Sequence, residues 1–274
     1  MIRLFYNKVG ENMRKVNEII AFLSSKGTWV NWDKTRDVVL YGDTDKSITK
    51  IGTCWVLTNH ALQQAIAADI HFVISHENCF YFESTQQYRL LLESRNRKQA
   101  LLKAHDITVY RSHDVWDYVS EFGNIDTFTK LIGLEFNPRQ ANDKYAFASF
   151  TPTSLTQIAK RITGALQGTG QAYCEILGNS DKEVTSLAVG IGAACNIFEM
   201  LSIKAVDCLM VSDDGACNWI EYQYCVDNDI PLIIVHHSTN EIPGMRQLTR
   251  YLKNNFSDLE VLSLDEGIKF SIIK

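Results

Sequence analysis

The sequence predicts an α/β protein built from two similar α/β modules, each a mixed sheet covered by helices. Three observations lead to this prediction. Apolar stretches of strand length alternate with amphipathic helical stretches along the whole chain, which is typical of sheets covered by helices. The stretches HFVIS and CLMVS both end in serine and are followed by acidic or histidine residues, so the two halves resemble each other. Histidines and carboxylates also follow three predicted strands, where open α/β sheets collect their ligands.

The composition is that of a folded intracellular protein. With 274 residues, 46% of them hydrophobic, the chain can form two modest domains or one large one. Its seven cysteines show no C-x-x-C or C-x-C spacing, which disfavours disulfides and thiolate zinc sites, so we expect a cytoplasmic protein. Residues 1–15 lack the apolar segment of a signal peptide, and no apolar run approaches the roughly 20 residues that span a bilayer. A net charge of −5 disfavours nucleic acid as a partner, and the basic segment 94–103 is predicted to be a solvated helix face.

In the first half, a predicted pair of adjacent strands is followed by further strands that alternate with helices. Helices are predicted where apolar residues recur three and four positions apart, as at Met13, Val16 and Ile20, and Thr58 or Asn59 is a suitable N-cap. The predicted elements are a helix at about 12–26, strands at 38–43 and 46–57 that pair with each other, a helix ending near Asp69, a strand at 70–75, a helix from about Ser84 to Ala104, and a strand at 107–113.

The second half follows a polar segment at 136–144 that contains a proline and is the best candidate for a domain boundary. We predict one domain of residues 1–135 plus 234–274 and a second of residues 136–233. The predicted elements are a strand at 145–150, a helix capped by Ser154, strands at 173–178 and 186–191, a helix from about Ala194, a strand at 207–212, a helix at 219–226, a strand at 231–237, a helix at 243–256 that opens with Pro243, and a strand at 259–264 that returns to the first domain.

Potential metal ligands follow three of these strands, as His76-Glu77, as His113 to Asp117, and as His237 to Glu241. Imidazole and carboxylate together suit Zn, Mn, Fe or Mg, and several carboxylates with a few imidazoles can hold two cations about 3.5–4 Å apart. The sequence therefore predicts a dinuclear metal site at the carboxyl ends of strands. The alternative, that these are hydrogen-bonded polar groups of the core, has equal support from the pattern alone.

Other polar residues near the predicted strand ends have simpler interpretations. Asp213 and Asp214 are interpreted as loop caps rather than substrate ligands. The glycines of residues 190–194 lack the G-x-G-x-x-G spacing of a phosphate loop, so we interpret them as close packing between a strand and a helix. His236 is expected to point to the face of its strand opposite His237.

With these motifs the sequence resembles the GTP cyclohydrolase 1 type 2 homologue family, also called NGG-one-interacting factor three-like. The resemblance covers most of the chain, including the stretches HFVISHEN, ITVYRSHDVWD and IPLIIVHHSTNEIPGMRQLTRYL. The family's His-His-Pro motif falls on residues 76–78, its His-Thr-Asn-Leu-Asp motif on residues 113–117, and its C-terminal His-x-x-x-Glu on residues 237–241.

The resemblance assigns a role to each motif residue. It implies that one metal is bound by His76 and His237, that the other is bound by Glu77 and Asp117, and that Glu241 bridges both. His113 is the implied catalytic residue, placed beside the metals as a proton carrier. At position 77 the family has a second histidine, and the glutamate found here shifts the expected metal toward Mn, Mg or Fe. The sequence also departs from the family's glycine-rich turn and from its Gly-Asp-x-x-x-His segment, which reads Ser212 to Cys217.

The expected function is metal-dependent hydrolysis of a small molecule, such as a nucleotide or another phosphoester, in the manner of a GTP cyclohydrolase type 2. The alternative is a non-catalytic protein that binds metal or a protein partner. The resemblance also implies self-association into a homo-oligomer, a ring-shaped hexamer.

Overall fold

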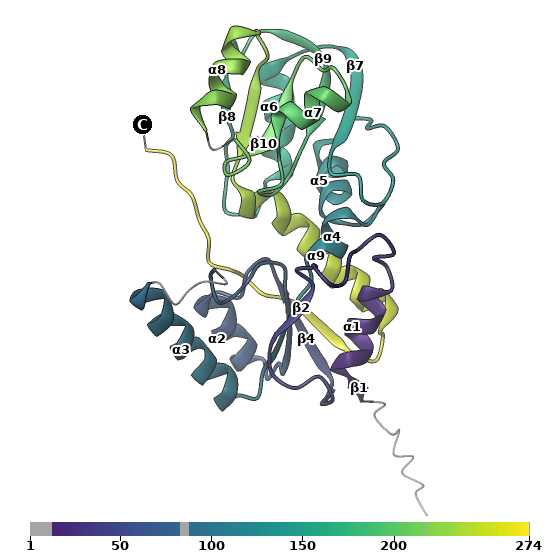
Figure 1. Ribbon diagram of the computed structural model, residues 1–274, viewed down its shortest axis with the longest axis vertical. Helices are drawn as coiled ribbons and strands as arrows, with labels where there is room; N and C mark the ends of the chain where they lie inside the picture. The colour runs from purple at the N-terminus through teal and green to yellow at the C-terminus, as the bar shows by residue number, and fades with distance from the viewer. Residues whose placement is uncertain (1–12, 83–87, 217, 274) are drawn as a thin grey trace, which may run out of the picture.

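The computed structural model describes residues 13–82, 88–216 and 218–273. Two five-stranded sheets lie one above the other in Figure 1, and the long helix α9 (His237–Asn255) runs between them. Both sheets are mixed and covered by helices, so the predicted fold class is confirmed. Among the described residues, no helix combines the length and the hydropathy that a membrane crossing requires.

The first sheet has the strand order β12-β4-β5-β6-β2, in which only β2 runs antiparallel to its neighbour. Its strands are β2 (Val38–Tyr41), β4 (Lys50–Cys54), β5 (Phe72–Ser75), β6 (Thr108–Arg111) and β12 (Glu260–Ser263). Its helices are α1 (Val16–Ser24), α2 (Asn59–Ala67), α3 (Arg89–Ala104) and α4 (Asp114–Tyr118). Helix α5 (Asn124–Ile132) follows α4 but packs its apolar face into the core of the second sheet. A separate antiparallel pair joins β1 (Arg14–Lys15) to β3 (Ser47–Ile48). Because both faces of β5 are buried, its first three residues appear in the sequence as a continuous apolar run, whereas the equally buried β6 also contains Thr108 and Arg111.

The predicted pairing of strands 38–43 and 46–57 is wrong. Strand β2 pairs with β6 at the edge of the sheet, whereas β4 lies between β12 and β5. Burial explains the difference, because Val38 and Val39 are about 40% exposed and suit an edge, while the last four residues of β4 are buried. The turn after β2 packs on β6, since a Cβ at Gly42 (φ +94°) would lie 2.6 Å from the Thr108 hydroxyl.

Two helices begin at residues other than the predicted ones. Residues 14 and 15 form β1, so the first helix begins at Val16 and not near residue 12, which itself lies outside the described residues. The predicted start of the third helix at Ser84 lies outside the described residues, and α3 begins at Arg89. Thr58 caps α2 as predicted, because its hydroxyl accepts the N–H of Ala61.

The second sheet has the strand order β7-β9-β10-β11-β8, with a parallel centre and an antiparallel strand at each edge. Its strands are β7 (Ala146–Ser154), β8 (Glu175–Leu177), β9 (Glu183–Val189), β10 (Leu209–Ser212) and β11 (Leu232–Val235). Its helices are α6 (Leu155–Ala165), α7 (Ile197–Ile203) and α8 (Trp219–Asp227). Ser154 caps α6 as predicted, because its hydroxyl accepts the N–H of Gln157.

Helix α9 begins at His237, six residues before the predicted start at Pro243, which lies inside the helix. Its first turn is capped from elsewhere in the chain, because Asp213 Oδ1, after β10, accepts the N–H of His237 at 2.9 Å. Gln171 Oε1 accepts the hydroxyl of Thr239. A cap that comes from another strand leaves no local signal in the sequence. The early start places His237 and Glu241 one helical turn apart.

The C-terminal segment returns to the first sheet as predicted, because β12 pairs in parallel with β4. Residues 264–273 then extend along the side of the molecule toward the second sheet (Figure 1). There the N–H of Phe270 donates to the carbonyl of Gly170 at 2.7 Å. The division of the chain into two domains at residues 135 and 233 stays a prediction.

Candidate metal centre

The six predicted site residues lie in one cluster at the carboxyl ends of β5, β6 and β11. His76 and Glu77 follow β5, and His113 follows β6. Asp117 lies in α4, and His237 and Glu241 lie in the first two turns of α9. The parallel strands β5 and β6 end at the same edge of the first sheet, while β11 of the second sheet leads into α9, which brings His237 and Glu241 to that edge.

His76 is fully buried at the centre of the cluster. Its Nδ1 lies 3.0 Å from the carbonyl of Ser112, so we assign the Nδ1–H as the donor and Nε2 as the free nitrogen. Nε2 lies 3.2 Å from Asp117 Oδ1 and 3.3 Å from Glu241 Oε2. The ring is thus fixed with its lone pair facing two carboxylates, which is the orientation of a metal ligand.

His237 is oriented in the same way. Its Nδ1 lies 2.7 Å from Asp214 Oδ2, and its Nε2 lies 2.8 Å from Glu241 Oε2. Asp214, interpreted from the sequence as a loop cap, therefore contacts a predicted ligand, whereas Asp213 is indeed the cap of α9. The indole N–H of Trp55 donates to the same Glu241 oxygen at 2.8 Å.

His236 faces away from the cluster, as expected. Its Nδ1 lies 2.8 Å from Asp213 Oδ2, and its ring stacks on Phe270 with the centroids 3.8 Å apart.

His113 stacks on His76 with the ring centroids 4.4 Å apart and an interplanar angle of 8°. Its Nδ1 lies 3.1 Å from both Asp114 Oδ1 and Asp117 Oδ2, and its Nε2 lies 3.5 Å from Glu77 Oε1. His113 is therefore as close to the carboxylates as the predicted ligands are. Its role as a proton carrier stays a prediction.

The two carboxylate oxygens of Glu77 have different partners, the guanidinium of Arg111 and the histidines of the cluster. Oε2 accepts a hydrogen bond from Arg111 Nη2 at 2.7 Å, while Oε1 lies 3.5 Å from His113 Nε2 and 3.6 Å from His237 Nε2. Arg111 is itself buried and donates from Nε to the carbonyl of His76 at 3.1 Å. One oxygen of Glu77 thus remains directed at the cluster.

The buried carboxylates give the centre a strongly negative electrostatic potential. Burial alone would lower the pKa of His113, but the adjacent Asp117 carboxylate raises it to about 10. Burial would likewise lower the pKa of His237, which the Glu241 carboxylate raises to about 11. For Glu77, burial is outweighed by the hydrogen bond from His113 and by neighbouring positive charges, which lower its pKa to about 2. The carboxylates thus favour positive charge on the imidazoles, and a divalent cation would supply such charge in place of protons.

The donor set fits divalent metals. Two groups of residues, one of His76, His113 and Asp117 and the other of His76, Glu77 and Glu241, each offer ligand atoms within 4.8 Å of one another. All are imidazole nitrogens or carboxylate oxygens, which suit zinc, manganese or iron. The buried amide of Asn124 donates to Asp117 Oδ1 at 2.9 Å, while its own oxygen has no hydrogen-bond partner.

A cavity of about 300 Å³ opens onto the cluster. The cluster forms one wall, Arg36 and Tyr118 lie beside it, and residues 191–194 close the cavity from the second sheet. Gly192 has φ +64°, and a Cβ there would lie 2.3 Å from Glu241 Oε1. Gly192 therefore packs against the cluster, which the interpretation as strand–helix packing missed, whereas Gly190 packs against Cys195 and Tyr145.

Four supporting residues were not identified from the sequence: Trp55, Arg111, Asn124 and Asp214. Asn124 lies in α5, a helix that was not predicted at all. Trp55 and Asp214 act through contacts between distant segments, which no local pattern reveals. Arg111 did offer a signal, because a charged residue within an otherwise buried strand requires a partner.

Comparisons with known proteins agree with the fold and with the resemblance seen in the sequence. A family model described as Duf34/NIF3 (NGG1p interacting factor 3) matches residues 12–267. A Clostridium acetobutylicum protein named GTP cyclohydrolase 1 type 2 homolog is 21% identical over 228 residues, covering 78% of this chain and 80% of that protein.

Two solved structures show the same fold. A Bacillus cereus protein related to NIF3 gives a TM-score of 0.75 at 11% identity, covering 96% of this chain and 99% of that one. Reduced HcgD from Methanocaldococcus jannaschii gives a TM-score of 0.68 at 19% identity, covering 92% of this chain and 98% of that one.

Proposed function

This chain belongs to the Duf34/NIF3 family, and on that premise we propose that it is a metal-dependent hydrolase whose cluster binds two divalent cations. The observation that carries the proposal is the position of Glu241. One of its carboxylate oxygens lies 3.3 Å from His76 Nε2 and 2.8 Å from His237 Nε2, deep in the cluster. That oxygen faces both imidazoles assigned to one cation, and a carboxylate has a second oxygen with which it could also hold the other cation.

In this proposal His76 and His237 hold one cation, Glu77 and Asp117 hold the other, and Glu241 is shared. The cations are Zn, Mn, Fe or Mg, and when bound they would supply Lewis-acid chemistry and a nucleophile at neutral pH. His113, with Nδ1 fixed between Asp114 and Asp117, carries a proton at Nε2, which lies 3.5 Å from Glu77 Oε1, and the residue lines the cavity.

The cavity suggests the class of substrate. Arg36 and Arg111 are both among its lining residues, and guanidinium groups recognise phosphate oxygens in a fixed geometry. A volume of about 300 Å³ suits a small molecule with its reactive group at the cluster. We therefore propose a phosphoester or a nucleotide, in line with the name of the Clostridium acetobutylicum relative, GTP cyclohydrolase 1 type 2 homolog.

The test is to restore the native metal to the purified protein and to screen phosphoesters and nucleoside triphosphates for hydrolysis. We expect His113→Gln to retain the metal and to lose most of the hydrolysis, because proton transfer contributes about 10²–10⁴-fold. Metal-loaded protein that hydrolyses none of these substrates would contradict the hydrolase and favour the non-catalytic metal-binding alternative.

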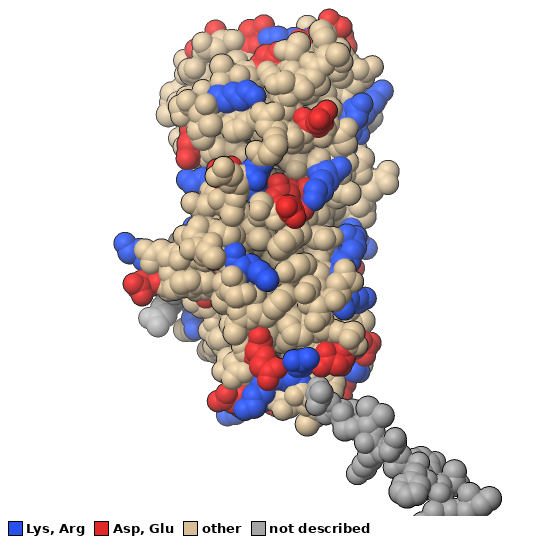
Figure 2. Space-filling view, turned by 90° about the vertical axis from the view of Figure 1, so that its right-hand side faces the viewer, with Lys and Arg blue, Asp and Glu red and all other residues tan. Residues whose placement is uncertain are grey.

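We also propose that the chain self-associates into a homo-oligomer, a hexamer. Exposed apolar side chains on α7 and α8 support this proposal, with Ile203 59%, Trp219 69% and Val226 62% exposed. By contrast, acidic and basic side chains are interspersed on the face shown in Figure 2. A monomer in sedimentation velocity at micromolar concentration would contradict this proposal.

A further inference from the structure

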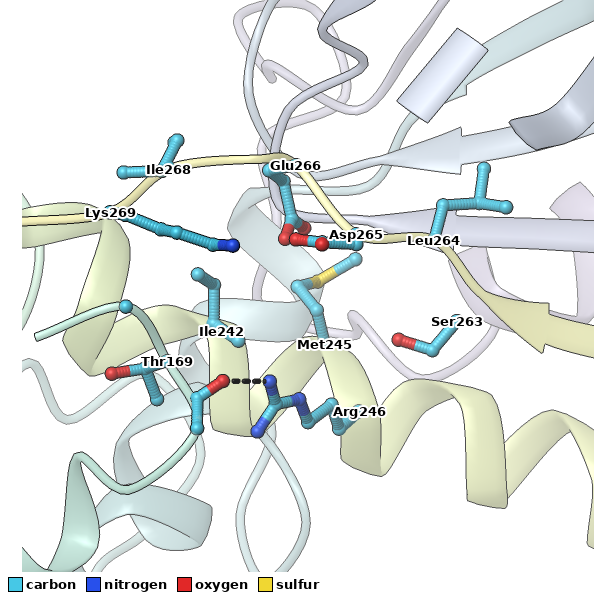
Figure 3. A pocket seen from close by; sticks show the side chains of 12 residues that line it. Thr169, Ile242, Met245, Arg246, Ser263, Leu264, Asp265, Glu266, Ile268 and Lys269 are labelled. Carbon is cyan, nitrogen blue, oxygen red and sulfur yellow. Dashed lines mark hydrogen bonds between the residues drawn. The ribbon is translucent and has the colours of Figure 1, made fainter. Parts of the chain in front are cut away.

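A second cavity, of about 310 Å³, lies where three segments meet (Figure 3). One wall is the turn of residues 168–170, and another is one face of α9. The third begins at Ser263, the last residue of β12, and continues to Lys269. It shares no lining residue with the cavity at the metal cluster. It is therefore a distinct site.

Its walls are held in place by backbone contacts. Gly170 has φ +97°, and a Cβ there would lie 2.1 Å from the carbonyl oxygen of Ile268, so the turn and the C-terminal segment touch directly. The guanidinium of Arg246 donates from Nη2 to the carbonyl of Gly168 at 2.5 Å, which joins α9 to the same turn (Figure 3). These contacts between protein groups hold the three walls of the cavity together.

Two acidic residues line this cavity, Asp265 and Glu266, and Glu266 is the buried one. Glu266 is only 8% exposed, and its Oε1 accepts the backbone N–H of Trp55 at 2.5 Å. Figure 3 shows its carboxylate pointing into the cavity. Glu266 forms no ion pair with another described residue. A buried carboxylate of this kind is costly unless a cationic group meets it.

Two basic groups line the same cavity. Figure 3 shows the side chain of Lys269 extending into it, and no described residue forms a hydrogen bond or ion pair with the Lys269 ammonium. Arg246 uses one nitrogen on Gly168 and keeps further N–H groups for a ligand. Ile242, Met245 and Leu264 provide an apolar surface between the charges.

We propose that this cavity binds a small zwitterion, namely a free α-amino acid with an apolar side chain. Its ammonium group meets Glu266, its carboxylate meets Arg246 and Lys269, and its side chain contacts Ile242 and Met245. Both charges of the ligand are needed, because a simple anion would face Glu266 and a simple cation would face the two basic groups. Charge-assisted hydrogen bonds of this kind are the strong ones in small-molecule sites.

The test is calorimetric titration of the purified protein with L-leucine and L-methionine. N-acetyl-L-leucine lacks the ammonium group and L-leucinamide lacks the carboxylate, so we expect both to bind at least tenfold more weakly than L-leucine. Glu266→Gln keeps an oxygen for the Trp55 N–H, and Lys269→Met keeps the length of an exposed side chain. We expect each variant to weaken L-leucine binding tenfold or more, while the surface controls Glu260→Gln and Lys253→Met leave it unchanged.

Two results would overturn the inference. One is the absence of L-leucine and L-methionine binding to the wild type up to about 10 mM. The other is N-acetyl-L-leucine binding as tightly as L-leucine, or L-leucine binding to both cavity variants with wild-type affinity. Lys269 is exposed, so Lys269→Met still tests the site if Glu266→Gln unfolds the protein. The inference does not depend on metal binding, and either proposal can fail alone.

Discussion

Replacement of Glu77 tests the residue at which this chain departs from the family motif. In Glu77→Ala the cluster loses the carboxylate oxygen that faces His113 and His237, and Arg111 loses its partner at 2.7 Å. We therefore expect two effects, weaker binding of one of the two cations and a less stable fold. In Glu77→His an imidazole nitrogen can reach the same metal, so we expect metal occupancy to recover, with a preference for zinc.

The loss of stability can be estimated from the geometry. The side chains of Arg111 and Glu77 are 10% and 21% exposed, so the pair is largely buried. Removing one partner of a buried pair costs about 3–5 kcal/mol, and the partial exposure of Glu77 favours the lower end, about 3 kcal/mol. Glu77→Gln keeps an oxygen for Arg111 and should cost about 1–2 kcal/mol.

Urea denaturation and metal titration of the same preparations measure both effects. The matched control is Glu93→Ala, because Glu93 binds Arg89 at a similar distance of 2.8 Å but with side chains 45% and 89% exposed. Its loss of stability should be much smaller. If Glu77→Ala binds two cations with wild-type affinity and unfolds like the control, Glu77 is a bystander and the assignment is wrong.

Three further predictions concern the surroundings of the cluster. Gly192→Ala should destabilise the fold by about 1–3 kcal/mol in urea, because Gly192 has a positive φ and packs against Glu241. The control Gly164→Ala, where a Cβ meets no atom within 4 Å, should not destabilise it. Equal urea midpoints for the two variants would contradict the close packing of Gly192 on Glu241. Asp214→Ala should weaken metal binding about 10–100-fold without changing the stoichiometry, and unchanged affinity by titration would refute its role in orienting His237. In chelator-treated protein the pKa of His113 lies at about 10, above the ordinary 6.5, so its stabilising effect is complete below pH 6.5 and is lost as the pH rises through 10. The melting temperature should therefore fall over this range, less so in His113→Gln, and identical pH profiles would contradict the electrostatic argument.

The parts of the fold predicted from the sequence are those with a local cause. Strand β5 is largely an apolar run because both of its faces are buried, and the ligands after β5 and β6 follow from the shared edge of parallel strands. The parts that were missed depend on distant segments. The start of α9 is set by Asp213, which follows β10, and the partner of β2 is set by the burial of β4.

The same distinction holds for the metal centre. His76, Glu77, His113, Asp117, His237 and Glu241 belong to short motifs, and the structure brings all six together. The residues that orient them come from elsewhere, as Asp214 does for His237 and Asn124 for Asp117. Their side chains acquire a role only when the two sheets and α9 are assembled, so no spacing in the sequence predicts them.

The most direct test of the proposed metal centre is the metal content of protein purified without chelators or affinity metal, measured by plasma mass spectrometry. We predict about two divalent cations per wild-type chain, and the same content in the control His60→Ala, whose side chain is 60% exposed. His237→Ala and Glu241→Ala should each lose most of the metal, because each removes a ligand from the shared centre. Full metal content in both variants would contradict the assignment of this cluster as the metal site.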